Sequence, residues 1–459
     1  MAANESEPVP PASPEIAPVR LLLSGRYLRV LVLTVLIGVP IALACFFFVG
    51  FQHWLEHGIW TVLPRDLGHD EAPWWWPLPT LALAGLLIGQ VVVRMPGHGG
   101  HLPVDGLGGA PLGPVELPGV VLASLSGLPF GVVLGPEGPL MALGSGLALF
   151  GAQRVGAAAA RDPRTVHVVA TAGSTAAIST ILGGPLVAAV LIVEVAGLAG
   201  ARLALLLLPC LAASAAGALV FTGFGRWTGL TIGGLGLPTV PPSTTPDVGD
   251  FLWGIPLAVL IAAAITLVRR LGRVTARWTY HDDHGPATML RTLGCAVAVG
   301  VCLAAYGLLT GRTPEEAALS GQAMLGDLAA HPGARSVAVL LALVLCKGLA
   351  WAVCLGSMRG GPVFPALLLG SATALACAAL PGLGATPALA LGLSAAAASV
   401  LGLPLCGAIL AALLLGKDAH DQMPLIVLAA VAAHLTTLAV QHGWPGRNRA
   451  VATDVRRRR

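Results

Sequence analysis

Long apolar runs, separated by short segments rich in glycine, proline and charged residues, make up most of this 459-residue chain. The runs cover residues 30–49, 81–93, 117–133, 166–182, 186–198, 203–220, 251–268, 293–309, 337–354, 366–380, 388–403 and 425–440. A membrane-crossing helix needs about 20 apolar residues, so the pattern predicts an all-α integral membrane protein with roughly 10–12 membrane segments. Several runs are too short for a simple crossing, which favours tilted, broken and re-entrant helices.

Composition supports a membrane protein. Hydrophobic residues make up 56% of the chain and charged residues 10%, whereas soluble domains contain about 25% charged residues. The net charge of +4 gives no sign of nucleic-acid binding. Arginines gather instead in a few polar stretches, at residues 20–29, 154–164, 269–277 and 456–459. By the positive-inside rule these stretches, and with them both termini, are expected on the cytoplasmic side of a multi-pass protein of the cell membrane.

One carboxylate stands inside a broken apolar segment. Glu137 lies in the sequence Gly-Pro-Glu-Gly-Pro, between apolar runs long enough to enter a bilayer. A charge at that depth costs about 3 kcal/mol on insertion scales, so an intramembrane acid points to function. Broken backbone at membrane depth is tolerated only where it is buried or lines a cavity. The segment therefore predicts a gate or coupling residue in a transport path.

The two halves of the chain share two ordered blocks. Residues 139–149 (PLMALGSGLAL) align with 365–375 (PALLLGSATAL), and residues 182–191 (LGGPLVAAVL) align with 401–410 (LGLPLCGAIL). The order is the same in both halves, which indicates an internal duplication. We expect a disordered tail over 1–18, a first membrane repeat over 19–225, a linker over 226–250, a second repeat over 251–445 and a short basic tail over 446–459 with no regulatory domain.

Duplicated membrane halves with interrupted helices are typical of transporters, which bind their substrate where half-helix ends meet. A helix N-terminus offers unpaired N–H groups and about half a positive charge, so several such ends aimed at one point form an anion site. Three Gly/Pro-led segments, at 100–103, 135–139 and 360–365, are predicted helix starts of this kind. The predicted substrate is a small anion.

These segments resemble the CLC family of chloride channels and proton-coupled anion transporters. Residues 135–139 (GPEGP) resemble the family motif G-[RK]-E-G-P, residues 360–365 (GGPVFP) its G-x-F-x-P region, and residues 184–194 (GPLVAAVLIVE) its A-P-L-A-G-x-x-F-x-x-E segment. The resemblance implies a CLC-like inverted-repeat fold, a homodimer with one pore in each subunit, and Glu137 as the gate. It also implies a set of anion-binding residues: Gly100, His101, Gly135, Gly138, Gly361, Val363 and Phe364.

The chain also departs from the family pattern. The motif G-S-G-I-P is matched only by residues 99–103 (GGHLP), so Gly100 stands where the family has an anion-contacting serine. Antiporting members have a second acid just after the position of Glu194, where this chain has Val195. The late tyrosine that closes the inner side of the family's pore has no match. Proton coupling is therefore doubtful on the sequence alone.

Two further charges in apolar surroundings have open roles. Glu194 is either a structural acid bound to helix ends or to Lys347, or a member of a proton relay. Lys347 is equally costly in lipid, and three roles are open for it: to snorkel, to neutralise Glu194, or to raise the positive potential of an inner vestibule. His98 and His101, three residues apart with no third ligand, are weak evidence for a metal site and are expected in a loop. An alternative is that their protonation makes transport pH-sensitive. Residues 281–284 (HDDH) are expected in a solvated loop.

The sequence thus predicts CLC-type transport of small inorganic anions, with chloride first among them. Proton-coupled exchange of chloride or of fluoride is the alternative, and an intramembrane metalloenzyme at His98 and His101 is a distant one. Neither an HExxH motif nor a nucleotide-binding loop is present, so no enzyme activity is expected. The eight cysteines lie in apolar stretches without a CxxC pair, and neither a metal nor a cofactor is predicted. The partners expected are the anion, protons in the alternative, the lipid bilayer and a second copy of the chain.

Overall fold

The structure is a computed structural model that describes residues 22–107, 109, 111–154, 163–182, 184–196, 200–228, 237, 240, 245–281 and 285–442. In these ranges helices are the regular secondary structure, joined by turns and loops, and the one pair of bridged extended residues is Gly135 with Gly361. The all-α prediction is confirmed. The expected terminal tails at 1–18 and 446–459, most of the linker, and residues 282–284 of the expected HDDH loop lie outside the described residues.

The first half of the chain forms α2 (Gly25–His57), extended by the π-helical η1 (Gly58–Val62) and α3 (Leu63–Asp66), then α4 (Pro77–Arg94), η2 (Pro96–Gly99), η3 (Pro103–Asp105), α5 (Leu117–Leu125), η4 (Leu128–Phe130), α6 (Glu137–Arg154), α7 (Pro163–Ile181), α8 (Pro185–Ala196) and α9 (Gly200–Thr228). The second half forms α10 (Val248–Thr279), α11 (Pro286–Thr310), η6 (Pro314–Glu316), α12 (Gln322–Ala330), α13 (Val337–Ser357), α14 (Val363–Ala376), α15 (Ala385–Leu401), α16 (Pro404–Leu415), η7 (Gly416–Asp418) and α17 (Ala419–His442).

Local signals explain where several helices begin. Ser24 and Ser336 accept hydrogen bonds from the first turns of α2 and α13, and Asp247 forms a capping box with Asp250 at α10. Such caps satisfy N–H groups that have no partner within the helix. Proline occupies the first turn of many of the others, including α4, α11 and α16, where its missing N–H does no harm.

The described helices include the expected mixture of lengths. Seven helical stretches are long and apolar enough to cross a membrane. They are Tyr27–Asp66, Pro77–Arg94, Leu203–Thr228, Val248–Thr279, Pro286–Thr310, Val337–Ser357 and Pro404–His442. Five further apolar helices are shorter, and α7, α8, α14 and α15 are among them. The prediction of half-length helices among full-length ones is confirmed.

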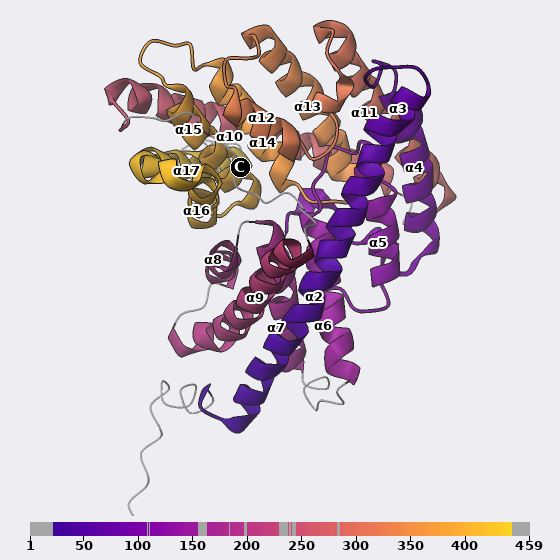
Figure 1. The fold of residues 1–459 in the computed structure, drawn as a ribbon, viewed down its shortest axis with the longest axis vertical. Coiled ribbons are helices and arrows are strands. Elements are labelled where there is room, and N and C mark those ends of the chain that lie inside the picture. Colours follow the sequence, from indigo (N-terminus) through magenta and orange to yellow (C-terminus); the bar gives the residue numbers. More distant parts are fainter. Residues whose placement is uncertain are drawn as a thin grey trace, which may run out of the picture.

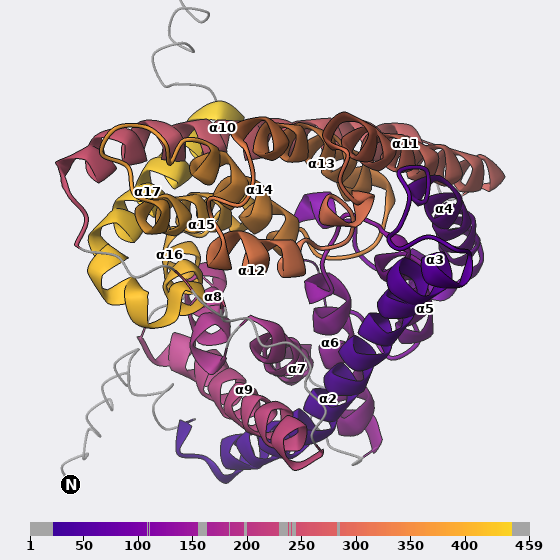
Figure 2. The same ribbon diagram turned by 45° about the horizontal axis from the view of Figure 1, so that its top comes forward.

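The two halves pack in the same order. In the first half α6 packs on α7, α7 on α9 and α2 on α9; in the second half α14 packs on α15, α15 on α17 and α10 on α17. Figure 1 shows α6 to α9 of the first half in the lower part of the view and most of the second half above them, with α3 and α4 at the upper right. The long α2 passes in front of the first half, and α10 and α11 run together along the top of Figure 2. The packing order supports two repeats, which remain a prediction.

Close glycine crossings occur at equivalent places in both halves. The sequence alignment sets Gly144 of α6 against Gly370 of α14. A β-carbon on Gly144 would overlap the carbonyl oxygen of Gly173 in α7, and one on Gly370 would lie 2.5 Å from the carbonyl oxygen of Gly392 in α15. At both crossings the helix backbones are therefore in direct contact, as small residues allow in membrane helices.

Gly370→Ala is expected to lower the thermal stability of the purified protein in detergent, because a backbone carbonyl cannot yield as a side chain can. Overpacking of this kind costs about 1–3 kcal/mol. The matched control is Gly348→Ala in α13, where an added β-carbon meets nothing within 4 Å. Melting temperatures followed by intrinsic fluorescence would test it; equal melting temperatures for the two variants would contradict the tight crossing.

Candidate functional site

The extended segments before α6 and α14 meet at the centre of the molecule. The N–H of Gly135 donates to the carbonyl of Gly361 at 2.8 Å, and the N–H of Gly361 donates to the carbonyl of Gly135 at 2.5 Å. The sequence alignment, with residue 139 on residue 365, makes these two glycines equivalent positions of the two halves. The bridge therefore joins equivalent positions of the two halves, shortly before the N-termini of α6 and α14.

Glu137, the first residue of α6, is completely buried beside this bridge. Its Oε1 accepts a hydrogen bond of 3.0 Å from the N–H of Phe364 in the first turn of α14. Its Oε2 is buried with no hydrogen-bond partner among the described residues. The α-carbons of Gly135 and Gly361 face the carboxylate so closely that a β-carbon on either would overlap it. The carboxylate thus occupies a tight backbone cradle at a positive helix end.

A cavity of 560 Å³ reaches the backbone beside this cradle. Gly138 and Gly360, the neighbours of Glu137 and of Gly361, line the cavity, and a β-carbon on Gly138 would lie 2.8 Å from the carbonyl oxygen of Gly360. Glu137 itself is not among the lining residues. The carboxylate therefore lies outside the cavity lining, next to two backbone segments that border the cavity and touch each other.

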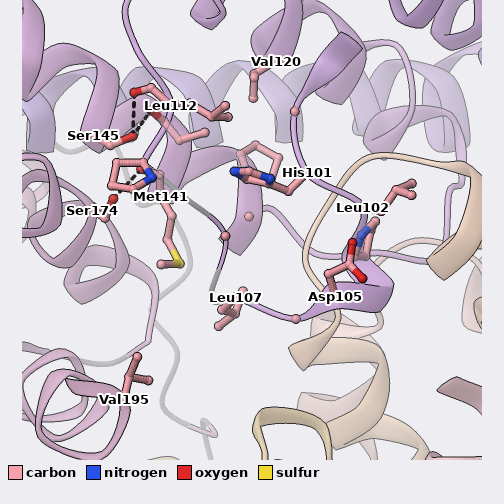
Figure 3. A pocket seen from close by; sticks show the side chains of 18 of the residues that line it. His101, Leu102, Asp105, Leu107, Leu112, Val120, Met141, Ser145, Ser174 and Val195 are labelled. Carbon is pink, nitrogen blue, oxygen red and sulfur yellow. Dashed lines mark hydrogen bonds between the residues drawn. The ribbon is translucent and has the colours of Figure 1, made fainter. Parts of the chain in front are cut away.

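The walls of the cavity carry most of their polar groups on five segments: the loop after η2, the helices α6, α7 and α10, and the segment before α14. The polar side chains that line it are His101, Asp105, Ser145, His167, Thr171, Ser174, Arg269 and Arg359. Figure 3 shows His101 projecting from its loop into the space beside Met141 and Ser145 of α6, with Val195 on the opposite side. The lining holds two arginines and one carboxylate, so its fixed charge is positive.

The loop that carries Gly100 and His101 has an unusual backbone. Residues 97–100 all have positive φ angles, from 50° at His98 to 96° at Gly100. Three of the four are glycines, which adopt this left-handed conformation without steric cost. Only a three-residue 3-10 turn, η3, follows, and the next α-helix begins at Leu117. The predicted helix start at residues 100–103 is therefore wrong, since the run of glycines turns the chain instead.

A buried arginine holds this loop against the segment before α14. Arg359 is 2% exposed, and its Nε and Nη2 donate to the carbonyl of His98 at 3.1 and 2.9 Å. Its Nη1 donates to the hydroxyl of Tyr280 at 2.8 Å and to its neighbour's carbonyl, that of Met358, at 3.3 Å. The guanidinium thus joins the loop and the segment before α14 at the cavity wall.

Glu194 lies at the end of α8 and contacts the other half of the chain. Its two carboxylate oxygens accept hydrogen bonds from the N–H groups of Leu405 and Cys406, at 2.8 and 2.6 Å, in the first turn of α16. The carboxylate caps the positive end of that helix. Of the two roles left open by the sequence, this contact favours the structural one.

Lys347 does not contribute to the cavity. It is fully buried in α13, and its Nζ donates to the carbonyls of Ala317, Ala318 and Leu319 at 2.9, 2.8 and 3.1 Å. The predictions that Lys347 neutralises Glu194 or snorkels to the surface are therefore wrong, and its role as a vestibule charge stays a prediction. An ammonium group has three donors, and here three carbonyls of the loop after η6 occupy them.

His98 and His101, the candidate metal ligands, have different surroundings. Nδ1 of His98 is 2.8 Å from the carbonyl oxygen of Val92, whereas His101 lines the cavity. Among the described residues no group of three or more His, Cys, Asp or Glu side chains could hold a metal ion. The geometry gives the metalloenzyme hypothesis no support.

Comparison with known proteins places the chain in a family. A family model described as voltage gated chloride channel matches residues 81–437. The chain belongs to the CLC family. Relatives with the name putative ion-transport protein YfeO agree with this: those from Escherichia coli strain SMS-3-5 and from Escherichia fergusonii are each 31% identical over 347 residues, which is 74% of this chain and 77% of theirs.

Solved structures show the same fold. A CLC-type fluoride/proton antiporter has a TM-score of 0.67 at 17% identity, covering 89% of this chain and 94% of its own. A slow cyanobacterial Cl⁻/H⁺ antiporter has a TM-score of 0.70 at 17% identity, covering 92% and 96%. A eukaryotic CLC transporter has a TM-score of 0.66 at 16% identity. The CLC-like fold, and with it anion transport across a membrane, is thus confirmed at the level of the family.

The residues predicted to bind the anion in this CLC protein fall into two groups. Gly135, Gly361 and Phe364 surround the carboxylate of Glu137, and Val363 begins the helix whose N-terminus faces it. Gly100 and His101 lie instead on the cavity wall, which Gly138 also borders.

Sequence reasoning missed the two lining arginines of the CLC chain, Arg269 and Arg359. The sequence pattern places Arg269 in a basic stretch expected on the cytoplasmic side, and Arg359 belongs to none of the predicted site motifs. A signal for Arg359 was present: it directly precedes the glycines at 360 and 361 and follows the apolar run of α13. A charge there is as costly in lipid as Glu137 is, so the same argument applied.

Proposed function

We propose that this protein conducts small inorganic anions, with chloride as its main substrate, and that Glu137 is the gate. The observation that carries the proposal is the position of the carboxylate, completely buried at a helix N-terminus next to the backbone segments that border a positively charged cavity. A charged carboxylate and an anion would compete for the same N–H groups. Protonation of Glu137 removes that competition and lets its side chain leave the cradle.

Gly135, Gly138, Gly361, Val363 and Phe364 then form the outer anion site in this proposal. The touching glycine backbones support it, because a side chain at Gly135 or Gly361 would fill the space that the carboxylate or an anion needs. Gly100 and His101 form part of the approach from the cavity. As in the family resemblance, we expect a homodimer in the cell membrane with both termini cytoplasmic.

We further propose that transport is only weakly coupled to protons. Val195, which stands where antiporting members have their inner acid, lines the cavity, and the preceding Glu194 is bound to the first turn of α16. Proton-coupled exchange of chloride or fluoride is the second candidate function, because the proteins of similar fold include a fluoride/proton and a Cl⁻/H⁺ antiporter by name.

Flux measurements with simultaneous pH recording distinguish these functions. Protein in liposomes is expected to dissipate a chloride gradient faster than fluoride or nitrate gradients, with little proton movement. Glu194→Gln is the matched variant: it is expected to weaken the cap of α16 but to leave the ratio of anions to protons unchanged. A fixed ratio in the parent protein, abolished by this substitution, would establish the antiporter and overturn weak coupling.

A further inference from the structure

Within the described part of the chain, Arg359 is a buried charge without a carboxylate partner. The ion pairs among the described residues join Arg312, Arg335 and His331 to Glu316 and Asp327, on the loops around α12, and none includes Arg359. Its neighbours are neutral: two backbone carbonyls, and Tyr280, whose ring centre lies 5.3 Å from the guanidinium carbon. Burying an ion in this way is costly unless another charge compensates it, so an anionic ligand is the expected complement.

The hydrogen bonds of Arg359 leave room for that ligand. A guanidinium has five N–H groups, and the four bonds made within the described part of the chain use one on Nε, two on Nη1 and one on Nη2. The second N–H of Nη2 is then available at a residue that lines the cavity. An arginine that is fixed on three sides and presents one donor is already arranged to bind a small anion.

The position of Arg359 along the chain connects it to the gate. Gly360 lines the same cavity, and Gly361 faces the carboxylate of Glu137. Since consecutive α-carbons are about 3.8 Å apart, the α-carbons of Arg359 and Gly361 are separated by about 7.6 Å at most. Arg359 therefore joins the cavity lining to the segment that holds the cradle, and an anion beside it would lie in the cavity that Gly360 also borders.

We propose that Arg359 binds the transported anion in the cavity and so supplies the contact that a serine side chain at Gly100 would otherwise give. In the loop of residues 97–100, the carbonyl oxygen of His98 accepts a hydrogen bond from this arginine. A carbonyl oxygen that pointed into the anion path would repel an anion. Arg359 therefore has two effects: it draws a carbonyl away from the path and offers a positive charge in its place. A compact monovalent anion is the ligand class that fits one available N–H.

This inference rests on the proposed function, so its test uses Glu137→Gln as the background, in which the gate no longer titrates. Arg359→Gln, Arg359→Lys and Arg359→His are each combined with it, and the chloride concentration that half-saturates flux is measured in liposomes. Loss of a charged hydrogen bond is worth about 1.5–3 kcal/mol, so Arg359→Gln is expected to raise this concentration about tenfold or more. Arg359→Lys keeps the charge but loses the planar fork of donors, so it is expected to raise this concentration clearly less than Arg359→Gln does.

Arg359→His distinguishes anion binding by residue 359 from a purely structural role. It also tests anion binding if the glutamine variant does not fold. The histidine is expected to make the half-saturating concentration depend on pH, lower at pH 5.5 than at pH 8, because an imidazole gains its charge across about pH 6.5. The other titratable or charged groups that line the cavity are His101, His167, Asp105 and Arg269, and Tyr280 contacts Arg359 directly. The background protein, measured at both pH values, therefore supplies the baseline. Loss of packing alone would give no such dependence.

The outcomes distinguish the two proposals. If Glu137→Gln does not change flux, the proposed gate is wrong whatever the arginine variants do. Suppose instead that Glu137→Gln raises flux, but the half-saturating concentration in the glutamine, lysine and histidine variants of Arg359 is the same as in the background. The proposed gate then stands, and anion binding by Arg359 is overturned. Equal loss of affinity in the lysine and glutamine variants, with no pH dependence in the histidine variant, also overturns it, because geometry and not charge would then matter.

Discussion

Glu137→Gln is expected to raise the anion flux of reconstituted protein and to remove its dependence on pH. In the parent protein we expect flux to increase as the pH falls, because protonation neutralises a carboxylate that otherwise holds the N–H of Phe364. A neutral amide has the same shape but does not form the charge-assisted bond, which is worth about 1.5–3 kcal/mol. The open state is therefore favoured by about tenfold or more at neutral pH. Chloride efflux from liposomes at pH 5.5, 7 and 8.5 measures both effects.

Glu194→Gln is the matched control for this experiment. Glu194 also accepts hydrogen bonds from N–H groups in the first turn of a helix, but it lies outside the cavity lining. The same chemical change there is expected to leave flux and its pH profile unaltered. Unchanged flux in Glu137→Gln, or an equal rise in both variants, would remove Glu137 from the role of gate.

The position of Glu137 could be predicted from sequence because two independent signals coincide there. A charge between apolar runs is costly, and the flanking Gly and Pro residues end regular helix. The repeat supplied a third constraint, since it aligned residue 135 with residue 361 before any contact was known. The structure pairs these two glycines directly, which is what a two-fold relation between the halves requires of a residue on its axis.

The partners of the buried cations could not be predicted in the same way. Lys347 donates to three consecutive carbonyls, and Arg359 to the carbonyl of His98. Every residue has a backbone carbonyl, so such acceptors leave no trace in the sequence, whereas a carboxylate partner would. For this reason Glu194 was the natural candidate partner for Lys347, although the fold takes it to α16 instead.

The predicted helix start at residues 100–103 failed for a local reason. A Gly/Pro-led segment is common to helix starts and to turns, and the sequence pattern is the same for both. Here four consecutive residues adopt positive φ angles, a conformation that glycine permits but that a helix cannot contain. The glycines at 97, 99 and 100 serve the turn, and α5 begins only at Leu117.

Gly361→Ala is expected to expel the carboxylate of Glu137 from its cradle. The added β-carbon would overlap Oε2 and lie 2.9 Å from the β-carbon of Glu137. The backbone cannot move apart, because both hydrogen bonds of the bridge to Gly135 hold it. We expect a loss of stability of about 1–3 kcal/mol, together with a flux that no longer depends on pH. Thermal denaturation in detergent and liposome efflux measure the two consequences.

The decisive comparison is a double-mutant cycle with Glu137→Gly, which removes both the carboxylate and the β-carbon that the new methyl group would meet. If the two side chains compete for one space, the stability lost in Gly361→Ala returns in the double variant, and the coupling energy is of the same size as the loss. Gly294→Ala in α11, where an added β-carbon meets nothing within 4 Å, controls for the change of residue type. If the stability losses of the two single variants simply add in the double variant, Glu137 does not fill the space beside Gly361. The hypothesis that Glu137 closes the path by filling that space would then be wrong.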